Sequence, residues 1–122
     1  MKQSPLLDKS FLFALSIVRF TQELQFSSKE YVLSKQVLRS GTAAGALLRE
    51  AEFAASPADY INKFTVALKE ANETEYWLLL IHRSGNMQAE LFDSLHISCT
   101  EFIKMLISSI NTLKKRHFKT KL

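Results

Sequence analysis

Three residues late in the chain have side chains that could bind a metal. Asp93, His96 and Cys99 follow one another at three-residue spacing, so a helix would place them near one face. Carboxylate, imidazole and thiolate groups are zinc ligands, and four-helix bundles hold two irons with paired Glu-x-x-His motifs. The chain has no Glu-x-x-His motif, and His82 and His117 fall at the ends of predicted helices. We therefore expect no metal and no cofactor, but a partly buried histidine and a packed cysteine.

Paired carboxylates could serve as general acid and base if burial separated their pKa values. Glu70 and Glu73 lie three residues apart on the third predicted helix, and Glu50 and Glu52 lie late on the second. Several basic residues fall near these carboxylates in the helical pattern: Arg49, Lys63 and Lys69. We expect ion pairs that hold two helices in register, and not acid–base catalysis.

Nucleophilic catalysis would need a hydroxyl or a thiol beside a base. Ser40 and Thr42 have no histidine at helical spacing, and Cys99 has only His96 on its own predicted helix. We predict that the protein is not an enzyme.

Basic side chains are the remaining source of chemistry. The chain carries 16 lysines and arginines against 12 acidic residues, for a formal net charge of +4. Residues 114–122 contain five of these bases and no acid. We predict a nucleic-acid-binding surface made by Lys35, Arg39, Arg49, Lys63, Lys114, Lys115 and Arg116. As an alternative, the terminal cations only oppose the negative end of a helix dipole and keep that end soluble.

Long helices must position these residues, because three glycines and two prolines leave few turns. Ser4-Pro5 and Ser56-Pro57 each join an N-cap to a first-turn proline, and Ser27-x-x-Glu30 is a capping box. With the apolar periodicity, these signals predict helices over residues 6–26, 28–55, 57–84 and 88–117. Short connections make neighbouring helices antiparallel, so we predict one all-α domain, residues 1–122, folded as an up-down-up-down four-helix bundle.

Gly41 and Gly45 lie one turn apart inside the second predicted helix. Each interior glycine costs a helix roughly 0.5–1 kcal/mol relative to alanine, so the pair indicates that another helix packs very close. We expect Gly41, Ala44 and Gly45 to form this packing surface, with residues 69–77 of the third predicted helix nearby. The same position inside a helix excludes a phosphate-binding glycine loop.

The sequence also has more apolar surface than one small bundle needs. The surplus comprises a second apolar stripe on the first predicted helix and the aromatic residues Phe20, Phe26, Phe53, Tyr60 and Trp77. We predict that this surface forms an interface between copies of the chain. A single cysteine fits a reducing compartment, and no segment approaches the ~18 apolar residues of a membrane span. We expect a cytoplasmic protein without membrane contact.

Several blocks of the sequence resemble a bacterial protein family. These blocks are Val32-Leu33-Ser34, Val37 to Thr42, Glu50-Ala51, Ser56 to Lys63 and Ala67 to Leu78. Over residues 8–81 the chain resembles the four-helix bundle family of the 23S rRNA-intervening sequence proteins, which is similar to accessory variability proteins of diversity-generating retroelements. The resemblance implies a ring-shaped homopentamer and, for the retroelement relatives, a basic surface that engages reverse transcriptase and nucleic acid. Leu47 departs from the family pattern, which often has asparagine at this point.

Together, the residues and the resemblance predict a non-enzymatic, oligomeric helical bundle that binds RNA, DNA or a nucleic-acid enzyme such as a reverse transcriptase. One alternative is a protein-binding scaffold whose charges only keep it soluble. Another is a metal-dependent bundle enzyme built around Asp93, His96 and Cys99.

Overall fold

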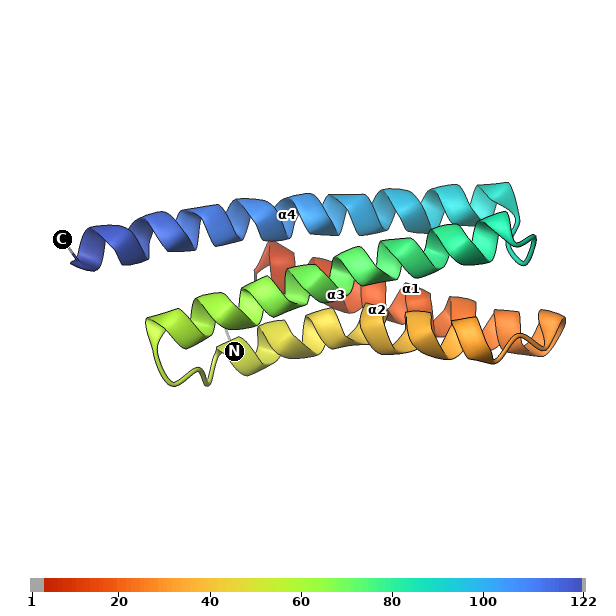
Figure 1. Cartoon of the computed structure of the whole chain (residues 1–122), viewed down its shortest axis with the longest axis horizontal. Coiled ribbons are helices and arrows are strands. Elements are labelled where there is room, and N and C mark those ends of the chain that lie inside the picture. The colour runs from red at the N-terminus through yellow and green to blue at the C-terminus, as the bar shows by residue number, and fades with distance from the viewer. Residues whose placement is uncertain (1–3, 122) are drawn as a thin grey trace.

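Four antiparallel helices make up the computed structural model, which describes residues 4–121 and the side chains of residues 4–119. The helices are α1 (Pro5–Ser28), α2 (Val32–Ala51), α3 (Pro57–Arg83) and α4 (Ala89–Lys121). Each contacts its neighbours in the order α1–α2–α3–α4, and a less extensive contact between α1 and α4 closes the ring of helices. Figure 1 shows the helices side by side and alternating in direction. The predicted all-α four-helix bundle is confirmed.

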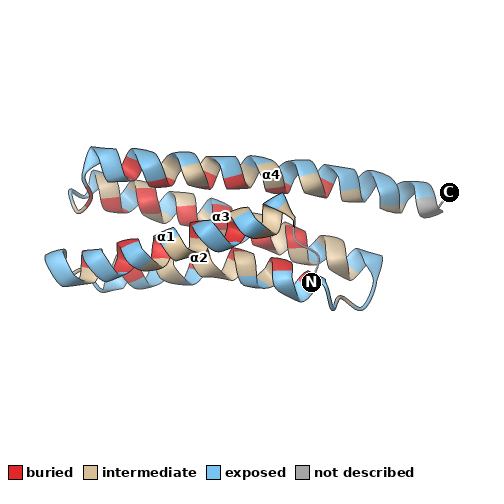
Figure 2. Ribbon diagram, turned by 180° about the vertical axis from the view of Figure 1, so that it is seen from behind, coloured by how far each residue is buried: buried red, intermediate tan, exposed pale blue. Residues whose placement is uncertain are grey.

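The core lies along the axis of the bundle and takes one stripe of side chains from each helix. Figure 2 shows this as buried residues on the inward sides of the ribbons. Phe13 of α1 and Phe102 of α4 are almost fully buried, and their ring centroids lie 5.7 Å apart. Phe20, which we counted as surplus surface, is also in this core, whereas Phe26 and Phe53 are exposed as expected. Although α4 has 33 residues, no described helix is both long and apolar enough to cross a membrane.

The turn between α1 and α2 differs from the predicted capping box. Lys29 adopts a left-handed conformation, with φ 55°, which ends α1 later than expected. Ser27 therefore still belongs to α1, where its hydroxyl donates to the carbonyl of Glu23 at 2.8 Å. The carboxylate of Glu30 instead accepts the backbone N–H of Ser34 at 3.0 Å. The predicted start of the second helix at residue 28 is thus wrong, because the chain reverses at Lys29.

The turn before α3 follows the sequence signals. The Ser56 hydroxyl accepts the backbone N–H of Asp59 at 3.0 Å, and the Asp59 carboxylate accepts the N–H of Ala55 at 3.0 Å. The preceding helix ends earlier than the predicted residue 55, because residues 52–54 form a tight turn with hydrogen bonds to carbonyls three residues back. At this same end of the bundle, α4 extends past the predicted residue 117, and its last turns project beyond the start of α3 (Figure 1).

Gly41 faces α1, not α3. A Cβ atom at Gly41 would lie 2.9 Å from Cγ2 of Ile17, which is too close for any real side chain. A Cβ atom at Gly45 would lie 3.4 Å from the Ser10 hydroxyl, so alanine fits there. Ala44 is fully buried in the core. The expected close approach of a helix is therefore present at Gly41, whereas Gly45 is not sterically required.

Candidate nucleic-acid interface

Cys99 and Asp93 do not converge on a metal site. Cys99 is fully buried, and its thiol donates to the backbone carbonyl of Ala71 at 3.5 Å. Burial raises the pKa of the Cys99 thiol to about 12, so the thiol stays protonated and unreactive near neutral pH. Asp93, on the same helix, is exposed to solvent. Within residues 4–119, no three histidine, cysteine or acidic side chains are grouped so that they could hold a metal.

His96 belongs to a small aromatic cluster between α3 and α4. Its ring stacks with Phe92 at 5.1 Å, and Phe92 also stacks with His82 at 4.3 Å. Nε2 of His96 lies 3.0 Å from the Glu75 carboxylate, and Nδ1 of His82 lies 3.0 Å from the carbonyl oxygen of Met87. These contacts give both histidines structural partners near the loop that joins the two helices.

The middle of α2 is tied to α3 by charged and polar contacts. Arg39 reaches the carboxylates of Glu70 at 3.0 Å and Glu73 at 2.5 Å. The indole N–H of Trp77 donates to the same Glu73 oxygen at 3.1 Å. The hydrogen bonds from Arg39 and Trp77 lower the pKa of Glu73, and the hydrogen bond to Glu73 raises the pKa of Arg39. The expected ion pairs between the second and third helices are present, although Arg39, and not Lys69, binds these glutamates.

A buried hydrogen bond lies beneath these ion pairs. Oγ1 of Thr74 lies 2.8 Å from Oγ of Ser40, and both side chains are fully buried. The expectation that residues 69–77 pack against the second helix therefore holds, but through Ser40 and Arg39 and not through the glycines.

The structure separates the seven basic residues that we expected to bind nucleic acid. Arg39 is bound to two glutamates, and Nζ of Lys63 lies 3.9 Å from the carboxylate of Glu50. Lys35 is exposed on α2, and Arg49 lines a groove between α1 and α2. The three others are exposed near the end of α4: Lys114, Lys115 and Arg116. These three are consecutive in the sequence and form one local cluster.

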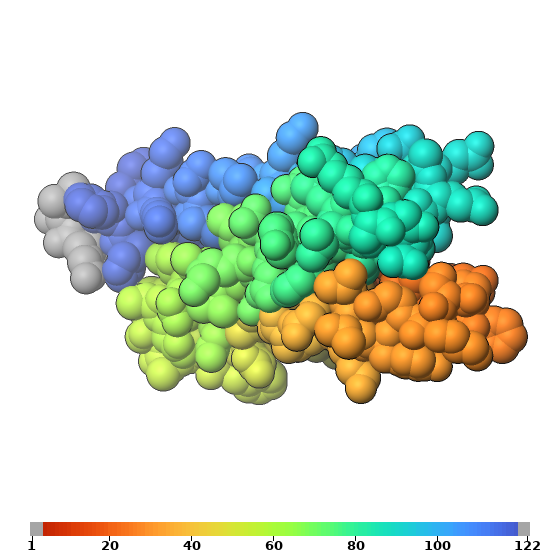
Figure 3. Space-filling view, turned by 45° about the vertical axis from the view of Figure 1, so that its right-hand side comes forward, coloured from red at the N-terminus to blue at the C-terminus, as the bar shows by residue number. Residues whose placement is uncertain are grey.

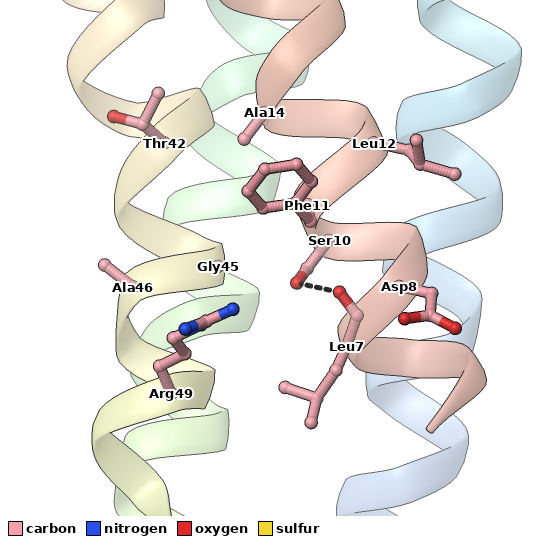
Figure 4. A pocket seen from close by; sticks show the side chains of 10 residues that line it. All are labelled: Leu7, Asp8, Ser10, Phe11, Leu12, Ala14, Thr42, Gly45, Ala46 and Arg49. Atoms are coloured by element: carbon pink, nitrogen blue, oxygen red, sulfur yellow. Dashed lines mark hydrogen bonds between the residues drawn. The ribbon is translucent and has the colours of Figure 1, made fainter. Parts of the chain in front are cut away.

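A groove between α1 and α2 has a volume of about 710 Å³. Phe11 and Leu12 of α1, each 61% exposed, lie along it, and small residues of α2 such as Gly45 and Ala46 form the opposite wall. Figure 4 shows the Phe11 ring in front of the space between the helices and the Arg49 side chain reaching from α2 toward α1. The sequence indicates the second apolar stripe on the first helix. It does not indicate the groove, which forms only because α2 packs beside that stripe.

The end of α4 carries a cationic surface without nearby acids on that helix. No acidic residue follows Glu101 in the sequence. Lys114, Lys115 and Lys119 are exposed, and Arg116 lines two hollows that Tyr60 and Leu113 also line. Figure 3 shows the end of α4, in dark blue, extending past the yellow-green start of α3. This segment presents positive charge at the end of the bundle that also holds the turn between α2 and α3, and Glu52 of that turn lines one hollow with Arg116.

Comparisons with known proteins agree with the fold. The sequence model of the 23S rRNA-intervening sequence proteins matches residues 2–108, so the cationic end of α4 lies outside the matched region. A solved structure, described as a protein with unknown function of the S23 ribosomal protein family from Bacteroides thetaiotaomicron, is 52% identical with a TM-score of 0.84. The alignment covers 86% of this chain and 97% of that one. No curated protein matches significantly. Because the matched region spans most of its length, the chain belongs to the family of 23S rRNA-intervening sequence proteins.

Proposed function

We propose that this protein is a non-enzymatic, oligomeric helical bundle that binds nucleic acid through the end of α4. The observation that carries the proposal is the cluster of exposed cations at that end, with no acidic residue after Glu101 in the sequence. Residues 1–113 carry a net charge of −1, so the whole positive excess of the chain lies in residues 114–122. A nucleic acid gains affinity from such a cluster because each phosphate contact releases condensed counterions.

The basic residues elsewhere support this choice of surface. Arg39 is engaged with Glu70 and Glu73, and Lys9 of α1 is bound to Glu101 of α4 at 2.8 Å. A phosphate at these positions would have to compete with a carboxylate that is already in place. The cations at the end of α4 have no acid of their own helix within several turns.

The apolar groove between α1 and α2 supports the oligomer. Phe11, Leu12 and Phe26 expose most of their apolar surface on α1, where a second copy could cover it. The family resemblance implies a pentamer, and we propose a homo-oligomer with that number of copies. A ring would repeat the cationic end of α4 in every subunit, so several ends could hold one nucleic acid at once and raise its affinity.

Fluorescence anisotropy with a short labelled RNA at low ionic strength tests the proposal. The variant Lys114→Ala/Lys115→Ala should weaken binding roughly 10- to 30-fold near 0.1 M salt, which is the counterion-release contribution of two contacts. The matched control, Lys69→Ala/Arg83→Ala, removes the same charge from exposed positions on α3 and should leave binding close to wild type. The proposal fails if the wild-type protein does not bind RNA or DNA, or if both variants lose affinity equally.

A second function, a protein-binding scaffold, is favoured by the same groove between α1 and α2. If nucleic acid does not bind, the exposed Phe11 and Leu12 would instead dock a partner protein. The scaffold predicts that a protein co-purifies with the wild-type chain and is lost from Phe11→Ser/Leu12→Ser, with no retention of either on heparin.

A further inference from the structure

One exposed face near the end of α4 combines cations with an aromatic ring. Asn111, Lys114, Lys115 and Phe118 follow one another at the spacing that aligns side chains along one side of a helix, and all four are exposed. Phe118 is 70% exposed, whereas Ile110 is buried on the inward side of the same helix. The ring of Phe118 therefore lies in solvent, one turn beyond the two lysines.

The surroundings of Phe118 differ from those of Phe53 and Phe26, which are even more exposed. Phe53 is 89% exposed but adjoins Glu52, whose charge would repel a phosphate. Phe26 is 78% exposed, and the ammonium group of Lys29 already lies 5.9 Å from its ring. The Phe118 ring, by contrast, lies in a segment whose charged residues are all cations.

We propose that this face binds a single-stranded nucleic acid, with a base stacked on Phe118 and the adjoining phosphates bound by Lys114 and Lys115. Binding of single strands combines a cationic surface with aromatic rings on which bases stack. A duplex cannot use the ring in this way, because its bases are already stacked on one another inside the helix. This inference rests on the proposed function and specifies the class of nucleic acid.

The geometry suits one base and its neighbouring phosphate. At about 1.5 Å of rise per residue, the backbones of Lys114 and Phe118 lie about 6 Å apart along the helix axis. The long lysine side chains can reach a phosphate while the ring, on the same face, contacts the base. Because Lys114, Lys115 and Phe118 are all exposed, the described residues leave this face open to a strand.

The test uses the full-length protein with labelled single-stranded RNA and DNA of one sequence, and with the matching duplexes. Phe118→Leu keeps an apolar side chain but removes the ring, and should lower single-strand affinity about 5- to 150-fold, the range that loss of one stacking platform gives. Its duplex affinity should not change. The control, Phe26→Leu, removes a comparably exposed ring from α1 and should bind as wild type does.

A spectroscopic readout reports stacking directly. Phe118→Trp should keep single-strand affinity, and its added fluorescence should be quenched by the single strand but not by the duplex. The wild-type protein is the baseline, since its one tryptophan, Trp77, lies on α3 and is bound to Glu73. Comparison of the RNA and DNA arms shows which sugar the site accepts.

The failures of the two proposals can be told apart. If Lys114→Ala/Lys115→Ala loses affinity while Phe118→Leu binds like wild type, the stacking site is wrong and the proposed function stands. Equal losses of affinity of Phe118→Leu for single strands and for duplexes would also overturn the stacking site. So would a change in the light-scattering mass of Phe118→Leu, because Phe118 would then belong to a subunit contact. If neither single strand nor duplex binds the wild type, the proposed function falls with the inference.

Discussion

The middle of α2 and the end of α4 contain similar residue types but use them differently. In the middle of α2, Arg39 binds two glutamates of α3, Ser40 bonds to buried Thr74, and Gly41 admits Ile17 of α1. Each of these contacts holds one helix against another. At the end of α4, cations and an aromatic ring of comparable chemistry face solvent. The comparison indicates that an exposed basic residue is a better candidate for binding where no ion pair to a neighbouring helix already holds it, as one holds Arg39.

The largest effect should come from Gly41→Leu. The new Cβ atom alone would lie 2.9 Å from Ile17, so α1 and α2 must separate or the side chain must leave its rotamer. Overpacking of this kind costs about 1–3 kcal/mol and sometimes more. We expect a large loss of urea stability or an unfolded chain.

Gly45→Ala is the matched control for this substitution. Its Cβ atom fits at 3.4 Å from Ser10, and alanine is the better helix former, so stability should be unchanged or rise by up to about 1 kcal/mol. A Gly41→Leu protein as stable as wild type would contradict the close packing of α1 on α2.

Thr74→Val should have an intermediate effect. It keeps the shape of the side chain but removes the 2.8 Å partner of the buried Ser40 hydroxyl, which is left with only a 3.5 Å contact to the Val37 carbonyl, at a cost of about 1–3 kcal/mol. The double variant Ser40→Ala/Thr74→Val should lose clearly less than the sum of the two single losses, because no polar group is then stranded. Additive losses in urea titrations would show that the hydrogen bond contributes nothing.

The ion pairs of Arg39 should contribute less than the buried hydrogen bond. The side chains are partly solvent-exposed, and such pairs are worth about 0.2–1 kcal/mol. Because Arg39 and Trp77 lower the pKa of Glu73 below its ordinary 4.5, the unfolded chain binds more protons than the folded one in this range. The contribution is therefore present above pH 4.5 and is lost as pH falls through the lowered pKa.

Glu73→Gln tests this pH dependence. The variant keeps an acceptor for Trp77 but cannot titrate, so its stability should fall less steeply with acid than that of wild type. Glu101, whose pKa is also lowered by its hydrogen bond from Lys9, remains in both proteins and cancels from the difference. Identical acid profiles would show that Glu73 is not coupled to folding.

The smallest effect on stability should come from the end of α4. Lys114 and Lys115 are exposed, so Lys114→Ala/Lys115→Ala should change the free energy of unfolding by no more than about 0.5 kcal/mol. A larger loss would mean that these lysines, like Arg39, serve the fold. The comparison between the two regions would then fail.

The sequence predicted the four helices because their caps and apolar periods agree, as at Ser56 and Asp59. It did not predict the turn after α1, because Ser-x-x-Glu is compatible both with a new helix and with the last turn of the old one. The left-handed conformation of Lys29 ends α1 at Ser28, so this segment forms the last turn of α1 and not the start of α2. A helical pattern places residues on a face of their own helix, but not opposite a particular side chain of the next.

The same limit explains why the sequence did not distinguish basic residues that bind another helix from those that face solvent. Arg39 and Lys114 looked equivalent in the sequence, and only packing showed that Glu70 and Glu73 face Arg39. Phe118 was missed although the signal was present, since its spacing from Asn111 and the lysines marks one face of a helix.

The salt dependence of RNA binding, measured for wild type and for Lys114→Ala/Lys115→Ala, tests the central claim most directly. If the end of α4 binds phosphates, the logarithm of wild-type affinity should fall linearly with the logarithm of salt concentration. The variant's slope should be shallower by about 1.4, the value for two single-strand phosphate contacts. A wild-type affinity indifferent to salt, or a slope that the substitutions leave unchanged, would contradict the account.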